Sequence, residues 1–425
     1  MNPQDQLIAI LKKKGTGPTM SKTLSEEELI ELTQLMANPD ANITTKATLL
    51  TAFLMLENTP EEATWLSQFS KDYKSNLPTE LHWLIEKTSS TPFESLTQKV
   101  ISHQDLSYEE MTWGMEQVLD SATPNLQKAA FLEAERLKRE NMDENIAALD
   151  VCQNISTSIK TDIPILIDLA VAYDGLGRTP CVWVATAAVL AALGYPTVLH
   201  GVDEVSPKRG VTPHKLLKCA GQDPLITPDQ AIARLHNPDI GWTYIDQYHS
   251  SPDLHDLKIL RKEMVKRPIL ATIEKLLQPI QGKKETITIT SYTHPPYKEK
   301  MIQLLKHNRQ DRFLLIRGVE GSIQLPTDRR APAISRTNDT ITDDFVRPED
   351  YETDKYPDGP ITSEESLTWC IEGLKGTHPY ATPWISYLAH TILSQVKLDN
   401  SPDLKAKIKA VLESGKALNH FQNFT

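Results

Sequence analysis

The segment 163–199 constrains the fold more than any other part of this 425-residue chain. A β-branched run at Ile163–Ile167 predicts a buried strand, and a turn-forming stretch follows at Ala172–Thr179. An alanine-rich helix is predicted at Ala185–Leu193, ending at a glycine, and Thr197–Leu199 begins a second strand. A strand, a loop, a helix and a strand make a βαβ unit, which requires a parallel sheet.

The second part of the chain, residues 161–425, is therefore predicted to be an α/β domain with a mainly parallel sheet. Residues 326–362 are rich in proline, threonine and charge, and a long loop is predicted there. The further predicted elements are strands at Trp242–Ile245, Thr286–Thr290 and Phe313–Ile316 and closing helices at Pro383–Val396 and Asp403–Leu418.

The first 160 residues are predicted to form an all-helical domain that contains an internal repeat. The motif Leu24–Leu29, which includes a helix-capping box, returns as Leu106–Met111. The sequence Ala52–Leu54 returns as Ala130–Leu132. We interpret this pattern as a helical unit carried twice; two unrelated amphipathic helix pairs are the alternative, since capping boxes are common. The copies are placed at about 20–70 and 102–155.

Composition excludes several classes of protein. The chain has 45 Lys plus Arg against 56 Asp plus Glu, a net charge of −11, which argues against a generally basic nucleic-acid binder. It has no apolar run of about eighteen residues that could span a membrane, and its start lacks the basic-then-apolar order of a secretory signal. The four cysteines form no CxxC pair, as is usual in a reducing compartment. We predict a cytoplasmic protein with no membrane segment.

The charge is unevenly distributed along the chain. Residues 255–335 contain 16 Lys plus Arg and 8 acidic residues, a balance of +8, so the remainder carries −19. This segment predicts an anionic partner, and a solvated basic face is the alternative. A spacing of three to four residues would place several of its cations on one helical face. They are Lys258, Arg261, Lys262 and Lys266, with Arg267 next in the chain.

Short motifs follow the helical segment and the glycine loop in a definite order. They are His200-Gly201, Gly241–Tyr244, Arg267–Ala271, Arg317–Gly321 and Ser414–Ala417. In this order they resemble the anthranilate phosphoribosyltransferase family (glycosyltransferase family 3) over nearly the whole chain. The resemblance implies a fold of the nucleoside phosphorylase and phosphoribosyltransferase type, and a homodimer formed through the helical domain. It also implies binding of phosphoribosyl pyrophosphate through magnesium and transfer of the ribosyl group to anthranilate.

The resemblance and the sheet geometry together predict a ligand site at the glycine loop. Open α/β sheets bind ligands beyond the carboxyl ends of their strands, and free backbone amides at a helix start favour a phosphate. A plain tight turn at the loop, a structural role for His200 and a solvated Lys208 are the alternatives. In this family an arginine contacts the carboxylate of the acceptor, and the resemblance implies that Arg261 has this role. The predicted ligand-binding residues are Asp174, Gly175, Arg178, Thr179, Thr186, His200, Gly201, Ser206, Lys208 and Arg261.

The sequence departs from the family at the magnesium site. The family's acidic pair falls on Ile323 and Gln324. Magnesium needs carboxylate or phosphate oxygens, so an isoleucine cannot bind it and a neutral glutamine is a poor substitute. Glu320 is the remaining candidate for one metal contact. The sequence therefore argues against the family's magnesium site.

The departures resemble a known offshoot of the family. Tyr173–Gly175, Arg267-Pro268 and Glu320–Ser322 fit a pattern found in cyanobacterial members, and a proteobacterial relative of these is described as a dimeric nucleic-acid binder without the enzyme's activity. The first hypothesis is a divergent relative that keeps an anion-binding cleft for a phosphorylated ligand, with weak or absent anthranilate transfer. The alternatives are an active pentosyltransferase for another acceptor, in which Asp174 or Glu320 contacts the metal, and a nucleic-acid-binding protein.

Overall fold

The computed structural model describes residues 2–72, 74–351, 353–356 and 359–423, and the chain divides into two compact units. The N-terminal break lies near the predicted one at residue 160. The sequence prediction places only one boundary, however, and so misses the later segment Asp256–Leu270, which belongs to the helical unit. The first unit comprises Met1–Val151 and Asp256–Leu270, and the second comprises Cys152–His255 and Ala271–Thr425.

The first unit is built from helices, as predicted. Its central helices, α3 and α8, are buried along most of their length and pack against each other. The helices are α1 (Pro3–Lys14), α2 (Glu26–Ala37), α3 (Ile43–Met55), α4 (Pro60–Lys71), α5 (His82–Glu86), α6 (Pro92–Ile101), α7 (Tyr108–Leu119), α8 (Asn125–Lys138), α9 (Met142–Ile155, which runs into the second unit) and α15 (Lys258–Met264), with short 3₁₀ turns η1 (Lys74–Asn76) and η2 (Thr79–Leu81).

The two segments interpreted as copies make matching local contacts. Helices α2 and α7 each begin with a capping box, in which a serine hydroxyl and a glutamate carboxylate bind backbone amides. The Leu24 amide donates to the Glu62 carboxylate at 3.0 Å, and the Leu106 amide donates to the Glu144 carboxylate at 2.7 Å. Both hydrogen bonds span 38 residues. The two segments therefore share these local contacts, and a helical unit carried twice stays a prediction.

The second unit is organised around a sheet that has seven strands among the described residues, in the order β4-β3-β2-β6-β7-β8-β9. The strands from β4 to β7 pair in parallel, and β8 and β9 are antiparallel. This arrangement confirms the predicted α/β class. The strands are β2 (Ile165–Ala170), β3 (Thr197–Gly201), β4 (Trp242–Asp246), β6 (Glu285–Ser291), β7 (Arg312–Ile316), β8 (Ala331–Thr337) and β9 (Thr340–Val346), with a separate pair β1 (Ile159–Lys160) and β5 (Ile280–Gln281).

The hairpin β8–β9 lies inside residues 326–362, where the sequence predicts a loop, so that prediction is wrong there. All residues of β9 except Val346 are exposed, so the strand shows no alternation of apolar and polar residues that would reveal it. The hairpin turns at Asn338 with φ 53°, a left-handed conformation that asparagine tolerates. Residues 352 and 357–358 of the predicted loop lie outside the described residues.

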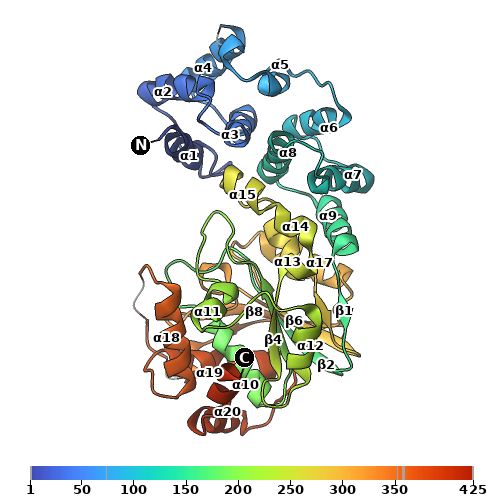
Figure 1. Ribbon diagram of the computed structural model, residues 1–425, viewed down its shortest axis with the longest axis vertical. Helices are drawn as coiled ribbons and strands as arrows, with labels where there is room; N and C mark the ends of the chain where they lie inside the picture. The colour runs from blue at the N-terminus through green and yellow to red at the C-terminus, as the bar shows by residue number, and fades with distance from the viewer. Residues whose placement is uncertain (1, 73, 352, 357–358, 424–425) are drawn as a thin grey trace. The chain divides into compact units, whose positions relative to one another are not determined.

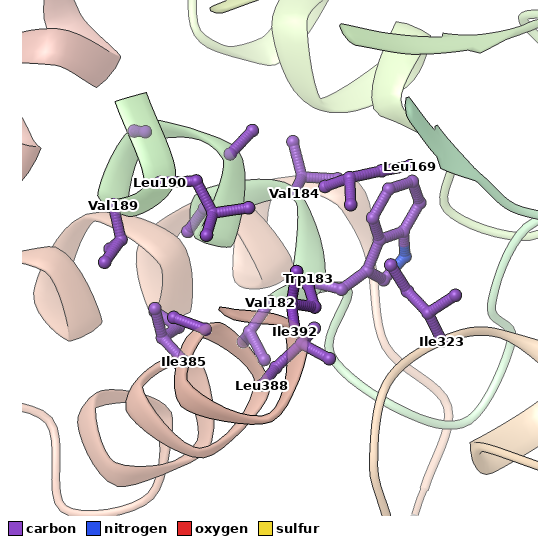
Figure 2. Packing of buried hydrophobic residues seen from close by; sticks show 14 of the residues in the cluster. Leu169, Val182, Trp183, Val184, Val189, Leu190, Ile323, Ile385, Leu388 and Ile392 are labelled. Carbon is purple, nitrogen blue, oxygen red and sulfur yellow. The ribbon is translucent and has the colours of Figure 1, made fainter. Parts of the chain in front are cut away.

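One face of the sheet is covered by an apolar helical layer. Every residue of α10 (Trp183–Ala192) is buried, and α10 packs against α18 (Ser363–Leu374) and α19 (Ala381–Gln395), with α20 beside them (Figure 1). The predicted helix 403–418 is in fact two, α20 (Leu404–Glu413) and α21 (Lys416–Gln422), because Gly415 adopts φ 72° between them. Figure 2 shows side chains of α10 and α19 meeting in this layer.

The opposite face of the sheet carries polar side chains of β2 and β3. Ile167 and Leu169 of β2 point into the apolar layer, so Asp168 between them points to the other face. His200 follows Leu199 of β3 in the same way. The remaining elements are α11 (Pro213–Cys219), α12 (Pro228–His236), α13 (Gln247–Ser250), α14 (Pro252–Asp256, which ends at the boundary of the units), α16 (Leu270–Ile273), η3 (Glu274–Leu276), α17 (Tyr297–His307), η4 (Val319–Gly321) and η5 (Pro348–Tyr351).

Two further observations concern the length of the helices and the cysteines. Within the described residues, no helix combines the length and the apolar character that crossing a membrane requires. The four cysteines are free thiols, and only Cys219 is exposed.

Candidate functional site

The site lies where the loops after β2 and β3 meet. We call residues 172–179 the first loop and residues 202–212 the second loop. The two are joined by paired hydrogen bonds, from the Leu176 amide to the Val211 carbonyl at 3.0 Å and from the Val211 amide to the Leu176 carbonyl at 2.7 Å. Gly175 adopts φ 71°, and a Cβ added there would lie 2.6 Å from the Val211 carbonyl oxygen. A glycine is therefore required for the two loops to approach this closely.

Two consecutive backbone amides of the first loop converge on one carboxylate. The Gly177 amide donates to Glu320 Oε2 at 3.0 Å, and the Arg178 amide donates to Glu320 Oε1 at 2.9 Å. The Glu320 side chain, which belongs to η4, is only 6% exposed. Successive amides that point at one spot form an anion-binding concavity. We call the Gly177 and Arg178 amides the cradle.

Lys208 of the second loop supplies positive charge beside the cradle. Its Nζ donates to the carbonyl oxygens of Gly175 and Glu320, both at 2.8 Å. The same atom lies 3.6 Å from Asp174 Oδ1 and 4.0 Å from Glu320 Oε2. Burial acts to raise the pKa of Glu320, but the two cradle hydrogen bonds and the Lys208 charge outweigh it, so the pKa lies below its usual value. Glu320 is therefore an anion at neutral pH.

The cavity next to Glu320 is small. It is lined by Gly175, Leu176, Lys208 and Glu320 among others, though not by Gly177 or Arg178, and has a volume of about 10 Å³, about what a single water molecule needs. This cavity is therefore too small for a phosphate in this conformation. The position expected for a phosphate contains the protein's own carboxylate.

The structure brings together only part of the predicted ligand-binding set. Asp174, Gly175 and Lys208 lie at the cradle, but Arg178 contributes its amide while its side chain is exposed. Thr186 is fully buried within α10, so no ligand reaches its hydroxyl in this conformation. The other predicted residues of this unit are all buried, namely Thr179, whose hydroxyl lies 3.3 Å from Tyr356 Oη, and His200, Gly201 and Ser206.

His200 forms part of a buried polar chain rather than facing solvent. Its Nδ1 lies 2.5 Å from Tyr173 Oη, and its Nε2 lies 3.1 Å from Asp168 Oδ1. All three side chains are buried, which favours the structural alternative for His200. The sequence analysis missed Asp168, although an aspartate in the middle of an otherwise apolar strand is itself a signal, because buried charges require partners.

The basic segment of the helical unit does not form the predicted single exposed face. Helix α15 ends at Met264, and Val265 adopts φ 55°, so Lys266 leaves the helical spacing. Arg261 is 2% exposed and Lys266 is 7% exposed. Lys258 is half-buried, and the exposed cations are Lys262 and Arg267.

Lys266 is instead an internal residue of the helical unit. Its Nζ donates to the Leu11 carbonyl at 3.0 Å. Burial lowers the pKa of Lys266 to about 8, although the nearby Glu133 acts in the opposite direction. Tertiary packing has therefore removed this charge from the predicted patch.

Ile323 and Gln324, on which the sequence predicts the family's acidic pair to fall, do not have side chains that fit magnesium. Ile323 is fully buried and lies beside the Trp183 indole in the apolar layer (Figure 2). Gln324 is also buried: its Oε1 accepts from the Trp183 amide at 3.1 Å, and its Nε2 donates to the Pro180 carbonyl at 2.8 Å. In the part of the chain that the structure describes, no group of three or more His, Cys, Asp or Glu residues could hold a metal ion.

Comparison with known sequences identifies similar proteins. Residues 94–154 match the glycosyl transferase family, helical bundle domain. An uncharacterised protein of Aquifex aeolicus is 28% identical over 247 residues, which cover 58% of this chain and 72% of that protein. The anthranilate phosphoribosyltransferase of Alkaliphilus metalliredigens is 24% identical over 269 residues, which cover 63% of this chain and 76% of that enzyme.

Solved structures show the same fold. The anthranilate phosphoribosyltransferase of Thermus thermophilus matches with a TM-score of 0.63 and 18% identity, covering 77% of this chain and 98% of that one. The Saccharomyces cerevisiae enzyme, solved in complex with phosphoribosyl pyrophosphate and magnesium, matches with a TM-score of 0.63 and 14% identity, covering 79% and 97%. The fold predicted from the sequence is thereby confirmed.

Proposed function

We propose that this chain, a distant anthranilate phosphoribosyltransferase-like protein of the glycosyl transferase family, binds a phosphorylated small molecule at the cradle. Its anthranilate phosphoribosyl transfer is weak or absent. The observation that carries the proposal is the pair of amides, Gly177 and Arg178, which hold a carboxylate with the Lys208 ammonium beside it. A site that stabilises one anion through fixed amides has the chemistry to accept another, because those donors recognise charge and geometry rather than a particular acid.

The structures of the relatives supply the candidate ligand class. The Saccharomyces cerevisiae enzyme was solved with phosphoribosyl pyrophosphate and magnesium, so we propose a phosphoribosyl or related phosphate ester here. Weak transfer follows from the metal position, where Ile323 is packed in the core and the Gln324 amide is satisfied by backbone partners. A ligand that keeps its phosphate contacts but lacks a metal to offset its charge is bound without being activated.

Calorimetry with phosphoribosyl pyrophosphate, with and without magnesium, tests the proposal. We expect binding whose affinity changes little on addition of magnesium, together with no anthranilate turnover in a fluorescence-based transfer assay. Efficient magnesium-dependent turnover of anthranilate would overturn the proposal. Absence of any binding, with or without the metal, would contradict the phosphate site itself.

The second candidate is an active phosphoribosyltransferase for a different acceptor. It is favoured by the convergence of Asp174 and Glu320 on one point, since both carboxylates lie within 4.0 Å of Lys208 Nζ. This candidate predicts that magnesium tightens binding strongly, because a divalent cation must then replace the lysine between the two carboxylates. The same calorimetry therefore separates the two candidates.

The organisation of the chain belongs to the same proposal. We propose a helical domain at 1–160 with an internal duplication, a glycosyltransferase-family-3-like α/β domain with C-terminal helices at 161–425, a homodimer and a cytoplasmic location. The narrower offshoot stays a prediction that depends on motifs such as Tyr173–Gly175, and the relatives described above add no support for it. Nucleic-acid binding is the least supported reading, because Arg261 and Lys266 of the predicted basic patch are buried.

A further inference from the structure

Glu320 has an unusual backbone conformation for its residue type. It adopts φ 51° and ψ 21°, in the left-handed region that is disfavoured for a residue with a Cβ. It is followed by Gly321, also left-handed with φ 78°. Strained residues of this kind concentrate at functional sites, where the surroundings hold them in place.

The carboxylate satisfies the cradle in the manner of an anionic ligand. Each of its oxygens accepts one of the two consecutive amides, at 3.0 and 2.9 Å. Two oxygens of a tetrahedral phosphate would need the same two donors. Carboxylate and phosphate therefore compete for one position, because each of the two amides already donates to a Glu320 oxygen.

Two charged side chains near Glu320 determine whether the position attracts or repels a phosphate. Lys208 Nζ lies 4.0 Å from the carboxylate, and Asp174 faces the same lysine at 3.6 Å. With Glu320 in place, two carboxylates face one ammonium, which repels a further anion. With Glu320 withdrawn, the cradle amides and Lys208 face a single carboxylate.

We propose that Glu320 is an internal competitor that occupies the phosphate position of the cradle and must swing out before a phosphorylated ligand binds. The inference rests on the proposed function, because it assumes that the cradle accepts phosphate at all. The inference adds a form of regulation. Without ligand, Glu320 blocks the cradle, and only a ligand that binds the cradle amides more strongly than the Glu320 carboxylate displaces that side chain.

The test is the affinity for inorganic pyrophosphate, measured by calorimetry on the full chain without added metal. E320Q removes the charge and keeps the shape of the side chain, and E320G removes the side chain while suiting the left-handed backbone. E299Q, at an exposed glutamate of α17 in the same unit, is the matched control for loss of one negative charge. Melting curves verify that each variant is folded.

We expect E320Q and E320G to bind pyrophosphate at least tenfold more tightly than the unmodified chain, and E299Q to bind with unchanged affinity. Equal affinity in all four proteins, or weaker binding by the Glu320 variants, overturns the competitor and leaves the proposed phosphate site standing. If the Glu320 variants as well as the unmodified chain bind no pyrophosphate, the phosphate site and the competitor are both overturned.

Discussion

Two regions of this chain carry sequence signals for anion binding, and the structure treats them in opposite ways. In the first loop the positive charge comes from backbone amides, and the structure places them around a carboxylate. In the segment 258–267 it comes from side chains, and the structure buries Arg261 and Lys266. Amides are fixed once the backbone path is set, whereas long cationic side chains turn toward whatever partners tertiary packing offers. A glycine loop is therefore the more dependable signal for a site.

The largest effect is expected from the substitution G175A. A Cβ there would lie 2.6 Å from the Val211 carbonyl and would sit at φ 71°, so the first and second loops must separate. We expect a loss of about 4 kcal/mol in the free energy of unfolding, measured by urea denaturation. G177A is the control in the same loop, since the nearest atom to its added Cβ is Glu320 Oε2 at 3.8 Å. A tolerated G175A would show that the cradle does not depend on this close approach.

The second-largest change in stability is expected for the substitution K266M, which removes the buried lysine of the helical unit. The folded-state pKa of Lys266 is about 8, against an ordinary value of 10.5. Between these values the unfolded chain binds more protons than the native state, so the lysine's contribution to stability rises with pH. The stability of the unmodified chain relative to K266M should increase by about 2 to 3 kcal/mol from pH 8 to pH 10.5, as read from urea denaturation.

K262M provides the comparison for this pH series, because Lys262 is an exposed lysine of the same segment. Its stability relative to the unmodified chain should stay constant over the same range. A flat pH series for K266M would mean that Lys266 is solvated and that the basic face predicted from the sequence exists after all.

A smaller loss of stability is expected from K208M, which removes the lysine ammonium beside the cradle. Lys208 donates to two carbonyl oxygens that belong to different segments, those of Gly175 and Glu320. Loss of these bonds should cost about 1 to 2 kcal/mol in unfolding free energy. The pKa of Glu320 should also rise, because Lys208 is one of the groups that lower it. K284M, at an exposed lysine, should leave stability unchanged. Equal losses of unfolding free energy in K208M and K284M would show that the Lys208 hydrogen bonds do not stabilise the two segments.

The smallest effect is expected for nucleic acid. With Arg261 and Lys266 buried, the predicted patch keeps the exposed Lys262 and Arg267 and the half-buried Lys258. The combined share of these three cations in any log–log salt slope for duplex DNA should therefore not exceed about 3. Fluorescence anisotropy of the unmodified chain and of a variant with Lys258, Lys262 and Arg267 all changed to methionine measures that share. A steeper difference would restore the basic segment as a binding surface.

Local sequence was sufficient for much of the fold. The capping boxes of α2 and α7 satisfy helix-end amides with side chains three residues away, and the βαβ unit follows from apolar runs and a glycine stop. The hairpin β8–β9 was missed because six residues of its outer strand are exposed and do not alternate as a half-buried strand does; β9 pairs along its length with β8.

In the candidate site, too, some residues could be predicted from local sequence and others could not. The first loop, Asp174 and Lys208 were predicted as site residues from the sequence, because open α/β sheets bind ligands at the loops that follow their strands, and the structure brings these residues together. The role of Glu320 was missed, since it was interpreted only as a possible metal contact. Its carboxylate meets Gly177 across more than 140 positions of sequence, and no local pattern reports a contact at that separation.

By itself the sequence determined the helical and α/β parts and the glycine loop, because each is set by residue type at short range. Only the tertiary structure decided which anion the loop holds and which lysines remain at the surface. Those outcomes depend on which distant segments pack together, and packing assigns partners to buried charges irrespective of their spacing along the chain.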